Sequence, residues 1–136
     1  MSDANEGGCQ CGKVRYRLEE EPLALAVCHC GECQRQSGSA FGMSLIVPKD
    51  SFRLLAGAPK IFTRAADSGA SVVCAFCPEC GTRIYHAPTS RVGTLNVKPG
   101  TLDDTSWLAP NVHVWTKNKQ PWVLVPEGVK SLEGQP

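Results

Sequence analysis

The sequence has no long hydrophobic run and no cluster of basic residues. Its 136 residues carry 14 Lys and Arg against 13 Asp and Glu, which gives a formal net charge of +1. Proteins that bind nucleic acids usually show a clustered basic surface, so this balance argues against a nucleic-acid partner. No stretch is long and apolar enough to cross a bilayer, which argues against a membrane protein.

The first residues also lack the features of an export signal. Residues 1–8 contain neither a basic segment nor an apolar core, so we expect a cytoplasmic protein. Eight cysteines then need an explanation, because the reducing cytoplasm disfavours disulfides. Cysteines one or two residues apart in such a protein are typical of metal ligands. An extracellular protein with disulfides is the alternative interpretation.

Amphipathic helices of ordinary length are missing as well. Ten prolines and thirteen glycines separate short apolar or alternating stretches, which predicts a mostly β protein of short antiparallel strands. Strands are expected at residues 13–18, 23–27, 41–47, 52–55, 60–63, 71–76, 83–86, 92–97 and 112–115. One helical turn is expected at 32–36 and a hairpin loop at 65–70. We expect residues 1–136 to form a single zinc-stabilised domain, with 1–6 and 126–136 as loosely ordered tails.

What the sequence does contain is a dense cysteine motif. Cys28, Cys30 and Cys33 are spaced C-x-C-x-x-C within six residues. Three thiolates can hold one zinc ion and leave one tetrahedral position open, which is the usual form of a catalytic or substrate-binding site. That open position suits a soft ligand, above all another thiolate. We therefore expect a thiol or a thiol adduct as the substrate.

Two further cysteine pairs lie on either side of this motif. Cys9 and Cys11 follow a glycine pair, and Cys77 and Cys80 precede Gly81. Combined, the two pairs make a four-cysteine site. Four thiolates fill all positions around zinc, so this site is expected to be structural.

Other interpretations of the central motif remain open. A fourth protein ligand would close the site, and the candidates are Cys74, His29, His86 and His113. Cys74 lies within an apolar strand and is expected to be a buried thiol. Cys30 and Cys33 also have the spacing of a redox motif, although the adjoining third thiol makes a metal the simpler explanation.

Several other side chains are candidates for a role beside the metal. His29 lies between two ligands and could move a proton, because the pKa of histidine is near neutral. Arg35 could bind a carboxylate of the substrate. His113 is expected to face outward if the valines on either side of it face inward. Trp107, Trp115 and Trp122 are expected to contribute core or rim packing rather than to bind substrate.

At these motifs the sequence resembles the glutathione-dependent formaldehyde-activating enzyme family, which shares a domain with centromere protein V. The matching stretches are residues 7–16, 28–38, 76–82, 100–104 and, more loosely, 110–115. The resemblance implies a β-rich, tent-like fold shared with some methionine sulfoxide reductases and Rab-binding zinc chaperones. It also implies two zinc ions: a structural one on Cys9, Cys11, Cys77 and Cys80, and a catalytic one on Cys28, Cys30 and Cys33.

The activity that the resemblance implies is carbon–sulfur lyase chemistry that makes or breaks S-hydroxymethylglutathione, with glutathione as co-substrate. We therefore expect a zinc-dependent lyase that acts on a small-molecule thiol adduct. The alternative is a zinc-stabilised binding or chaperone-like module without catalytic activity. An open cysteine site and the absence of a basic arm both favour the enzyme.

Overall fold

The computed structural model of this chain describes residues 5–66 and 69–135. Strands dominate these residues, so the predicted mostly β class is confirmed. The chain divides into two compact units, one made of Met1–Leu23 and Leu45–Trp107, the other of Ala24–Ser44 and Leu108–Pro136. In the described part of the chain, no helix is long and apolar enough to span a membrane.

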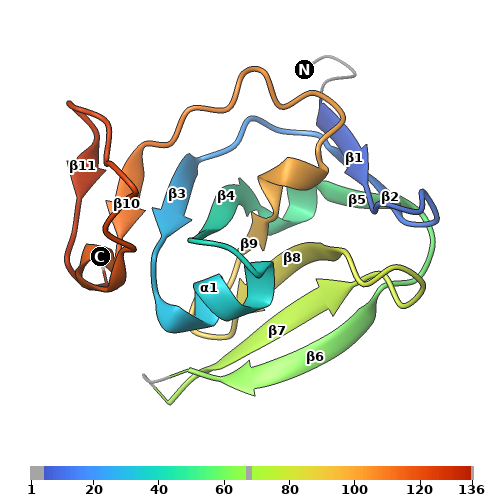
Figure 1. The fold of residues 1–136 in the computed structure, drawn as a ribbon. Coiled ribbons are helices and arrows are strands. Elements are labelled where there is room, and N and C mark those ends of the chain that lie inside the picture. The colour runs from blue at the N-terminus through green and yellow to red at the C-terminus, as the bar shows by residue number, and fades with distance from the viewer. Residues whose placement is uncertain (1–4, 67–68, 136) are drawn as a thin grey trace. The chain divides into compact units, whose positions relative to one another are not determined.

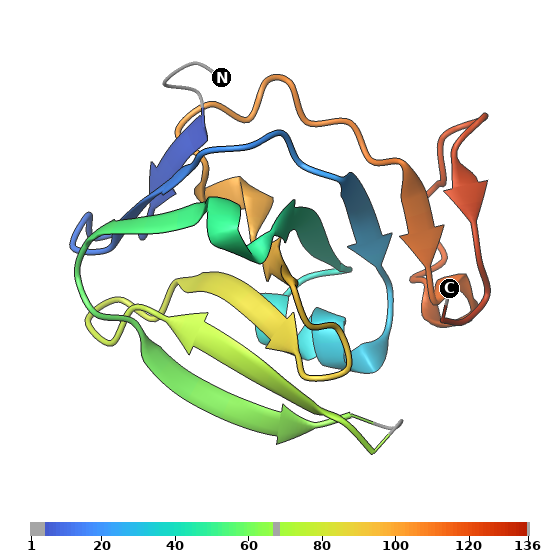
Figure 2. The ribbon, with the colours of Figure 1, turned by 180° about the vertical axis from the view of Figure 1, so that it is seen from behind.

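The first unit contains two antiparallel groups of strands. One has the order β1-β2-β5, and the other has the order β4-β9-β8-β7-β6. Figure 2 shows β6 and β7 as a long hairpin. The strands are β1 (Glu6–Gly8), β2 (Arg15–Leu18), β4 (Gly42–Pro48, in this unit from residue 45), β5 (Phe52–Ala56), β6 (Lys60–Ala65), β7 (Ser71–Phe76), β8 (Arg83–Pro88) and β9 (Thr94–Val97).

The core of the first unit is built on residues that alternate along the strands. Tyr16 and Leu18 are buried in β2 while Arg17 between them is exposed, as the alternating pattern predicted. The Tyr16 ring stacks on Phe52 at a centroid distance of 5.0 Å. Its hydroxyl lies 2.7 Å from Oγ1 of Thr101. A short 3₁₀ turn at Lys49–Ser51 connects β4 to β5, and another at Pro99–Thr101 follows β9.

The second unit brings together segments that are far apart in the sequence. Strand β10 (Val112–Val114) pairs in parallel with β3 (Ala24–Cys28) on one side and with β11 (Lys130–Ser131) on the other. Figure 1 shows these three strands side by side. Helix α1 (Gly31–Ser37) follows β3, and a 3₁₀ turn at Thr116–Asn118 follows β10. Parallel strands need long connections, which is why no hairpin signal marks this group in the sequence.

The predicted elements correspond closely to the observed ones. Each predicted strand overlaps an observed strand, and the predicted helical turn lies within α1. The sequence did not indicate β1 or β11, which place Glu6 and Lys130–Ser131 of the expected tails in strands. The hairpin loop expected at 65–70 falls partly on residues 67–68, outside the described residues. The domain boundaries remain a prediction.

The buried hydroxyl of Tyr16 supplies a stability test. Thr101 Oγ1 donates its own hydrogen to the carbonyl of Lys98 at 2.6 Å, so the Tyr16 hydroxyl donates to Thr101. Tyr16→Phe is expected to lower the free energy of unfolding by about 1 kcal/mol, because it removes one buried hydrogen bond and keeps the ring. Urea unfolding with zinc present would measure this. Tyr85→Phe is the control, since the Tyr85 hydroxyl has no hydrogen-bond partner among the described residues, and equal losses in both variants would contradict the assignment.

Candidate functional site

Four cysteines of the first unit converge, as the sequence predicted. Cys9 and Cys11 lie in the turn between β1 and β2, and Cys77 and Cys80 lie in the turn between β7 and β8. Their sulfur atoms all lie within 4.8 Å of one another. Each turn closes with a glycine at φ +82°, Gly12 in the first and Gly81 in the second. Glycine adopts this left-handed conformation without the strain that a side chain brings.

Hydrogen bonds hold these two turns in place. The Gln10 N–H donates to Thr82 Oγ1 at 3.1 Å, which joins the two turns. The Val14 N–H donates to Cys9 Sγ at 3.2 Å. The Thr82 hydroxyl, 3.2 Å from the sulfur of Cys80, and the Thr82 backbone N–H lower the pKa of Cys80 to about 5. Donors directed at sulfur stabilise thiolates, and thiolates are what a metal binds.

Three cysteines of the second unit form the other cluster. Cys28 ends β3, Cys30 caps the N-terminus of α1, and Cys33 lies in the first turn of that helix. Their sulfur atoms also lie within 4.8 Å of one another. The Cys33 N–H donates to Cys30 Sγ at 3.3 Å, so the first helical turn fixes the position of that sulfur. The local spacing alone therefore brings the three side chains together.

The three thiols do not ionise alike. Hydrogen bonds from Cys28 and Cys33 lower the pKa of Cys30 to about 2. The same hydrogen bonding, with Cys30 as the acceptor, raises the pKa of Cys28 to about 11, and the pKa of Cys33 is also raised. The cluster therefore favours one thiolate held by two thiols. Three thiolates at this separation require a positive charge among them.

His29, between two of these cysteines, is fully buried and paired with another histidine. Its Nε2 lies 2.8 Å from Nδ1 of His113, and its ring meets Phe41 edge-on at 5.7 Å. Burial is the main cause that lowers the pKa of both imidazoles. Nδ1 of His29 is buried and has no hydrogen-bond partner among the described residues. The pair is thus held neutral, and the catalytic role expected for His29 stays a prediction.

The prediction that His113 faces outward was wrong. Its side chain is only 5% exposed, and Val114 beside it is buried as well. An alternating pattern of apolar and polar residues indicates the buried face of a strand only when the opposite face is exposed to solvent. The His113 ring is covered by the imidazole of His29, which stacks on it at a centroid distance of 5.1 Å, and no local pattern in the sequence indicates that these two residues meet.

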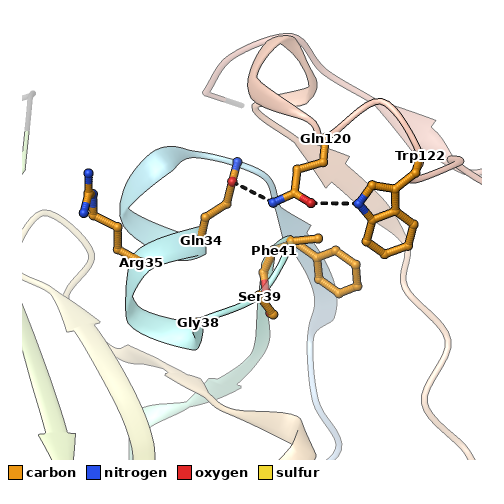
Figure 3. Close-up of a pocket in the computed structure, with 8 residues that line it drawn as sticks. Gln34, Arg35, Gly38, Ser39, Phe41, Gln120 and Trp122 are labelled. Atoms are coloured by element: carbon orange, nitrogen blue, oxygen red, sulfur yellow. Dashed lines mark hydrogen bonds between the residues drawn. The ribbon is translucent and has the colours of Figure 1, made fainter.

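A pocket of about 650 Å³ lies beside α1 in the same unit. It is lined by residues of α1, of the segment after it, and of the C-terminal part of the chain: Gln34, Arg35, Gly38, Ser39, Ala40, Phe41, Gln120 and Trp122. Arg35 is exposed, and its guanidinium has no hydrogen bond or ion pair among the described residues. Its guanidinium points away from Gln120 and Trp122 in Figure 3. Trp122 is 70% exposed, so it contributes a rim of this pocket rather than core packing.

A chain of amide groups connects the pocket to the cysteine cluster. Gln34 Nε2 donates to the carbonyl of His29 at 2.8 Å, and Gln120 Nε2 donates to Gln34 Oε1 at 3.1 Å. Trp122 Nε1 in turn donates to Gln120 Oε1 at 2.7 Å, as Figure 3 shows. The sequence indicated neither Gln34 nor Gln120, and it suggested only core or rim packing for Trp122. The glutamines are 86 residues apart, and no local pattern indicates that they meet.

The side chains considered as a fourth ligand are otherwise engaged or belong to the first unit. His29 and His113 bond to each other. Cys74 is fully buried in β7, as expected of a packed thiol. His86 of β8 accepts a hydrogen bond from Arg83. Within the described residues of the second unit, the cluster consists of three sulfur atoms.

Comparison with known proteins agrees with these cysteine groups. Residues 4–118 match the model of a family described as glutathione-dependent formaldehyde-activating enzyme. Proteins of Aspergillus flavus and Penicillium rubens whose names place them in this family are 29% identical over 89 residues and 27% identical over 77 residues. The matches cover 61% and 57% of this chain, but only 46% and 39% of the fungal proteins.

A solved structure supports the fold independently. A crystal structure of a Rhodobacter sphaeroides protein superimposes with a TM-score of 0.57, covering 77% of this chain and 91% of that chain at 20% sequence identity. At this identity the likeness bears on the fold alone. The family match spans most of the chain, including all seven clustered cysteines. The chain therefore belongs to the glutathione-dependent formaldehyde-activating enzyme family.

Proposed function

We propose that this protein is a zinc-dependent carbon–sulfur lyase that acts on an adduct of glutathione or another thiol, such as S-hydroxymethylglutathione. One observation carries the proposal: three cysteine sulfurs converge with no fourth protein ligand among the described residues of their unit, and helix α1, which carries Cys33, also lines a surface pocket. The family match supports the thiol chemistry. We place the protein in the cytoplasm, where free glutathione is abundant and thiols stay reduced.

The donor atoms fit two zinc ions. An all-sulfur set of four converging cysteines matches a closed tetrahedral site, so Cys9, Cys11, Cys77 and Cys80 would hold a structural zinc. Cys28, Cys30 and Cys33 would hold the second zinc and leave one position for an outside ligand. Bound there, zinc supplies positive charge that favours the thiolate form of the substrate sulfur.

The pocket beside α1 has groups that match the rest of a glutathione adduct. Gln34 donates both Nε2 hydrogens to backbone carbonyls. Gln120 keeps one N–H and one oxygen lone pair that can pair with the peptide groups of glutathione. Phe41 and Trp122 supply apolar walls. Arg35 is the cation of this pocket, and its exposed side chain is free to rotate toward a carboxylate. These residues would bind and orient the adduct, and Cys28, Cys30 and Cys33 would hold the zinc whose open position suits its sulfur.

His29 and His113 are the groups proposed to hold the proton. Both are neutral because of their burial, and they lie within one hydrogen bond of each other. A neutral imidazole can accept the proton that leaves a hydroxymethyl group as the carbon–sulfur bond breaks. The pair would share that proton, and the same proton would return in the reverse direction. His29 thus acts beside the sulfur ligands without being one of them.

Metal content tests the assignment of the two sites. Native mass spectrometry of protein purified in reducing buffer is expected to show two zinc ions per chain, and Cys30→Ser is expected to show one. Cys74→Ser is the matched control: it also removes one cysteine, but that cysteine lies outside both clusters, so both ions should stay. Two ions in Cys30→Ser, or a loss of zinc in Cys74→Ser, would contradict the assignment.

Gly42 offers a test that leaves every ligand in place. A Cβ at Gly42 would lie 2.7 Å from Gln36 Nε2, 3.1 Å from Cys33 Cβ and 3.4 Å from Cys33 Sγ. Gly42→Ala should therefore push Cys33 from its position and weaken zinc binding at the three-cysteine site about tenfold. Gly31→Ala is the control, because a Cβ there meets no atom within 4 Å. Competition with a chelator measures the affinity, and equal affinities in the two variants would count against the close approach.

Activity is tested by the exchange between glutathione and formaldehyde, followed by NMR. Zinc-loaded protein is expected to accelerate the exchange, and Cys30→Ser is expected not to. Arg35→Ala should raise KM for the adduct about tenfold at nearly constant kcat, because it removes a charge-assisted hydrogen bond to the substrate. Arg91→Ala, at another exposed arginine, serves as control and should leave both constants unchanged.

The same assay distinguishes the enzyme from a binding module. A wild-type protein with two zinc ions that accelerates no exchange with glutathione or with other small thiols would favour the non-catalytic alternative. Acceleration with another thiol only would keep the lyase and replace glutathione as its substrate. Unchanged KM in Arg35→Ala would remove Arg35 from the binding site and leave the reaction type as it stands.

A further inference from the structure

The first unit carries a second group of polar side chains that the metal sites do not use. Phe62, Cys74, His86 and Asn96 are aligned across β6, β7, β8 and β9 by the register of the strands. Side chains at paired positions of neighbouring strands lie on the same face of a sheet. This row therefore places an imidazole and an amide next to each other on one face.

Positive side chains surround this row. Arg83 begins β8, where the register with β7 shifts, and its guanidinium lies 5.9 Å over the ring of Phe62. Lys98 follows β9, and its N–H continues the ladder to the carbonyl of Ile84. Arg64 lies two residues beyond Phe62 on β6. Strand alternation puts Lys98 and Arg64 on the same face as His86 and Asn96.

His86 is buried among these positive side chains. Arg83 Nη1 lies 3.0 Å from His86 Nε2, and because a guanidinium only donates, Nε2 accepts and the imidazole proton is on Nδ1. The side chain is 7% exposed. Burial, followed by repulsion from Lys98, Arg83 and Arg64, lowers the pKa of His86 to about 3. His86 is thus neutral at pH 7 and adds polarity without adding charge.

Two groups in this cluster have unused hydrogen-bonding capacity. Arg83 bonds to His86 and covers Phe62, and it forms no ion pair with a carboxylate among the described residues. The amide oxygen of Asn96 is buried without a hydrogen-bond partner in the same part of the chain. A half-turn of this amide exchanges its oxygen for its NH₂ group, which donates. Arg83 bonds to His86, and Asn96 is the strand partner of His86, so a guanidinium and an amide that can donate are both available to two oxygens of one group.

We propose that Arg83, His86 and Asn96 form a binding site for an oxyanion, a carboxylate or phosphate group, with Lys98 and Arg64 supplying additional positive charge. Arg83 would donate to the anion through nitrogens not bonded to His86, and Asn96 would donate through its turned amide. The anion would compensate the positive charges that surround the neutral imidazole. This site is independent of the thiol chemistry proposed above, and the anion would bind to it without contacting either zinc ion.

NMR of the zinc-loaded, full-length protein tests this site with two probes, inorganic phosphate and acetate. Saturable shifts are expected for the Cε1–H of His86 and for the side-chain NH₂ of Asn96, with the His86 signal assigned by its loss in His86→Gln. Sodium chloride at the same ionic strength is the control for screening. Tighter binding of phosphate identifies a phosphate site, and tighter binding of acetate identifies a carboxylate site.

Variants of Arg83 provide the second arm. Arg83→Gln should weaken binding of the preferred anion about tenfold or more, since a charge-assisted hydrogen bond is lost, and Arg83→Lys should retain part of the affinity. Arg53→Gln is the matched control, because Arg53 is a strand arginine of the same unit that already pairs with Glu19. Wild-type amide spectra in each variant would show that the fold is intact. Shifts that chloride reproduces, or unchanged affinity in both Arg83 variants, would overturn the proposal.

Discussion

Crowded sulfur atoms impose the strongest constraint on this chain. Thiols held within 4.8 Å of one another cannot all lose their protons, because each new thiolate repels the others. In the second unit this leaves a single favoured thiolate at Cys30. A cation bound among the sulfur atoms attracts all of the thiolates and offsets their mutual repulsion. The turns around both clusters follow from the same requirement, since glycines and backbone N–H groups let the sulfurs approach.

The sequence was a good guide wherever the relevant contacts are local. The spacing of Cys28, Cys30 and Cys33 predicts their convergence, because one strand end and one helical turn suffice to bring them together. Alternation likewise predicts the buried face of β2. Glycine-flanked cysteine pairs at 9–11 and 77–80 predict the four-cysteine group, although 66 residues separate them. In that case the prediction depends on the tendency of cysteine pairs to share one metal ion, and not on their separation in the sequence.

Other parts of the site depend on long-range contacts that leave no local pattern. His113 is buried against the imidazole of His29, which lies 84 residues away in the sequence. Gln34 and Gln120 look like ordinary polar surface residues until the fold joins them. No local pattern in the sequence indicates that cations gather around His86 either. The net charge of +1 counts every arginine alike. It does not distinguish Arg17, which pairs with the acid Glu6, from Arg83, which pairs with an imidazole.

The amide chain from His29 to Trp122 makes the indole a natural optical reporter. Tryptophan emission responds to the hydrogen bond on Nε1 and to water around the ring, and here that bond leads through Gln120 and Gln34 to the peptide carbonyl between two cysteines. A molecule that enters the pocket and displaces Gln120 therefore changes the surroundings of the fluorophore and one support of the cysteine loop together. Trp122 is therefore an intrinsic fluorophore at the rim of the candidate binding pocket.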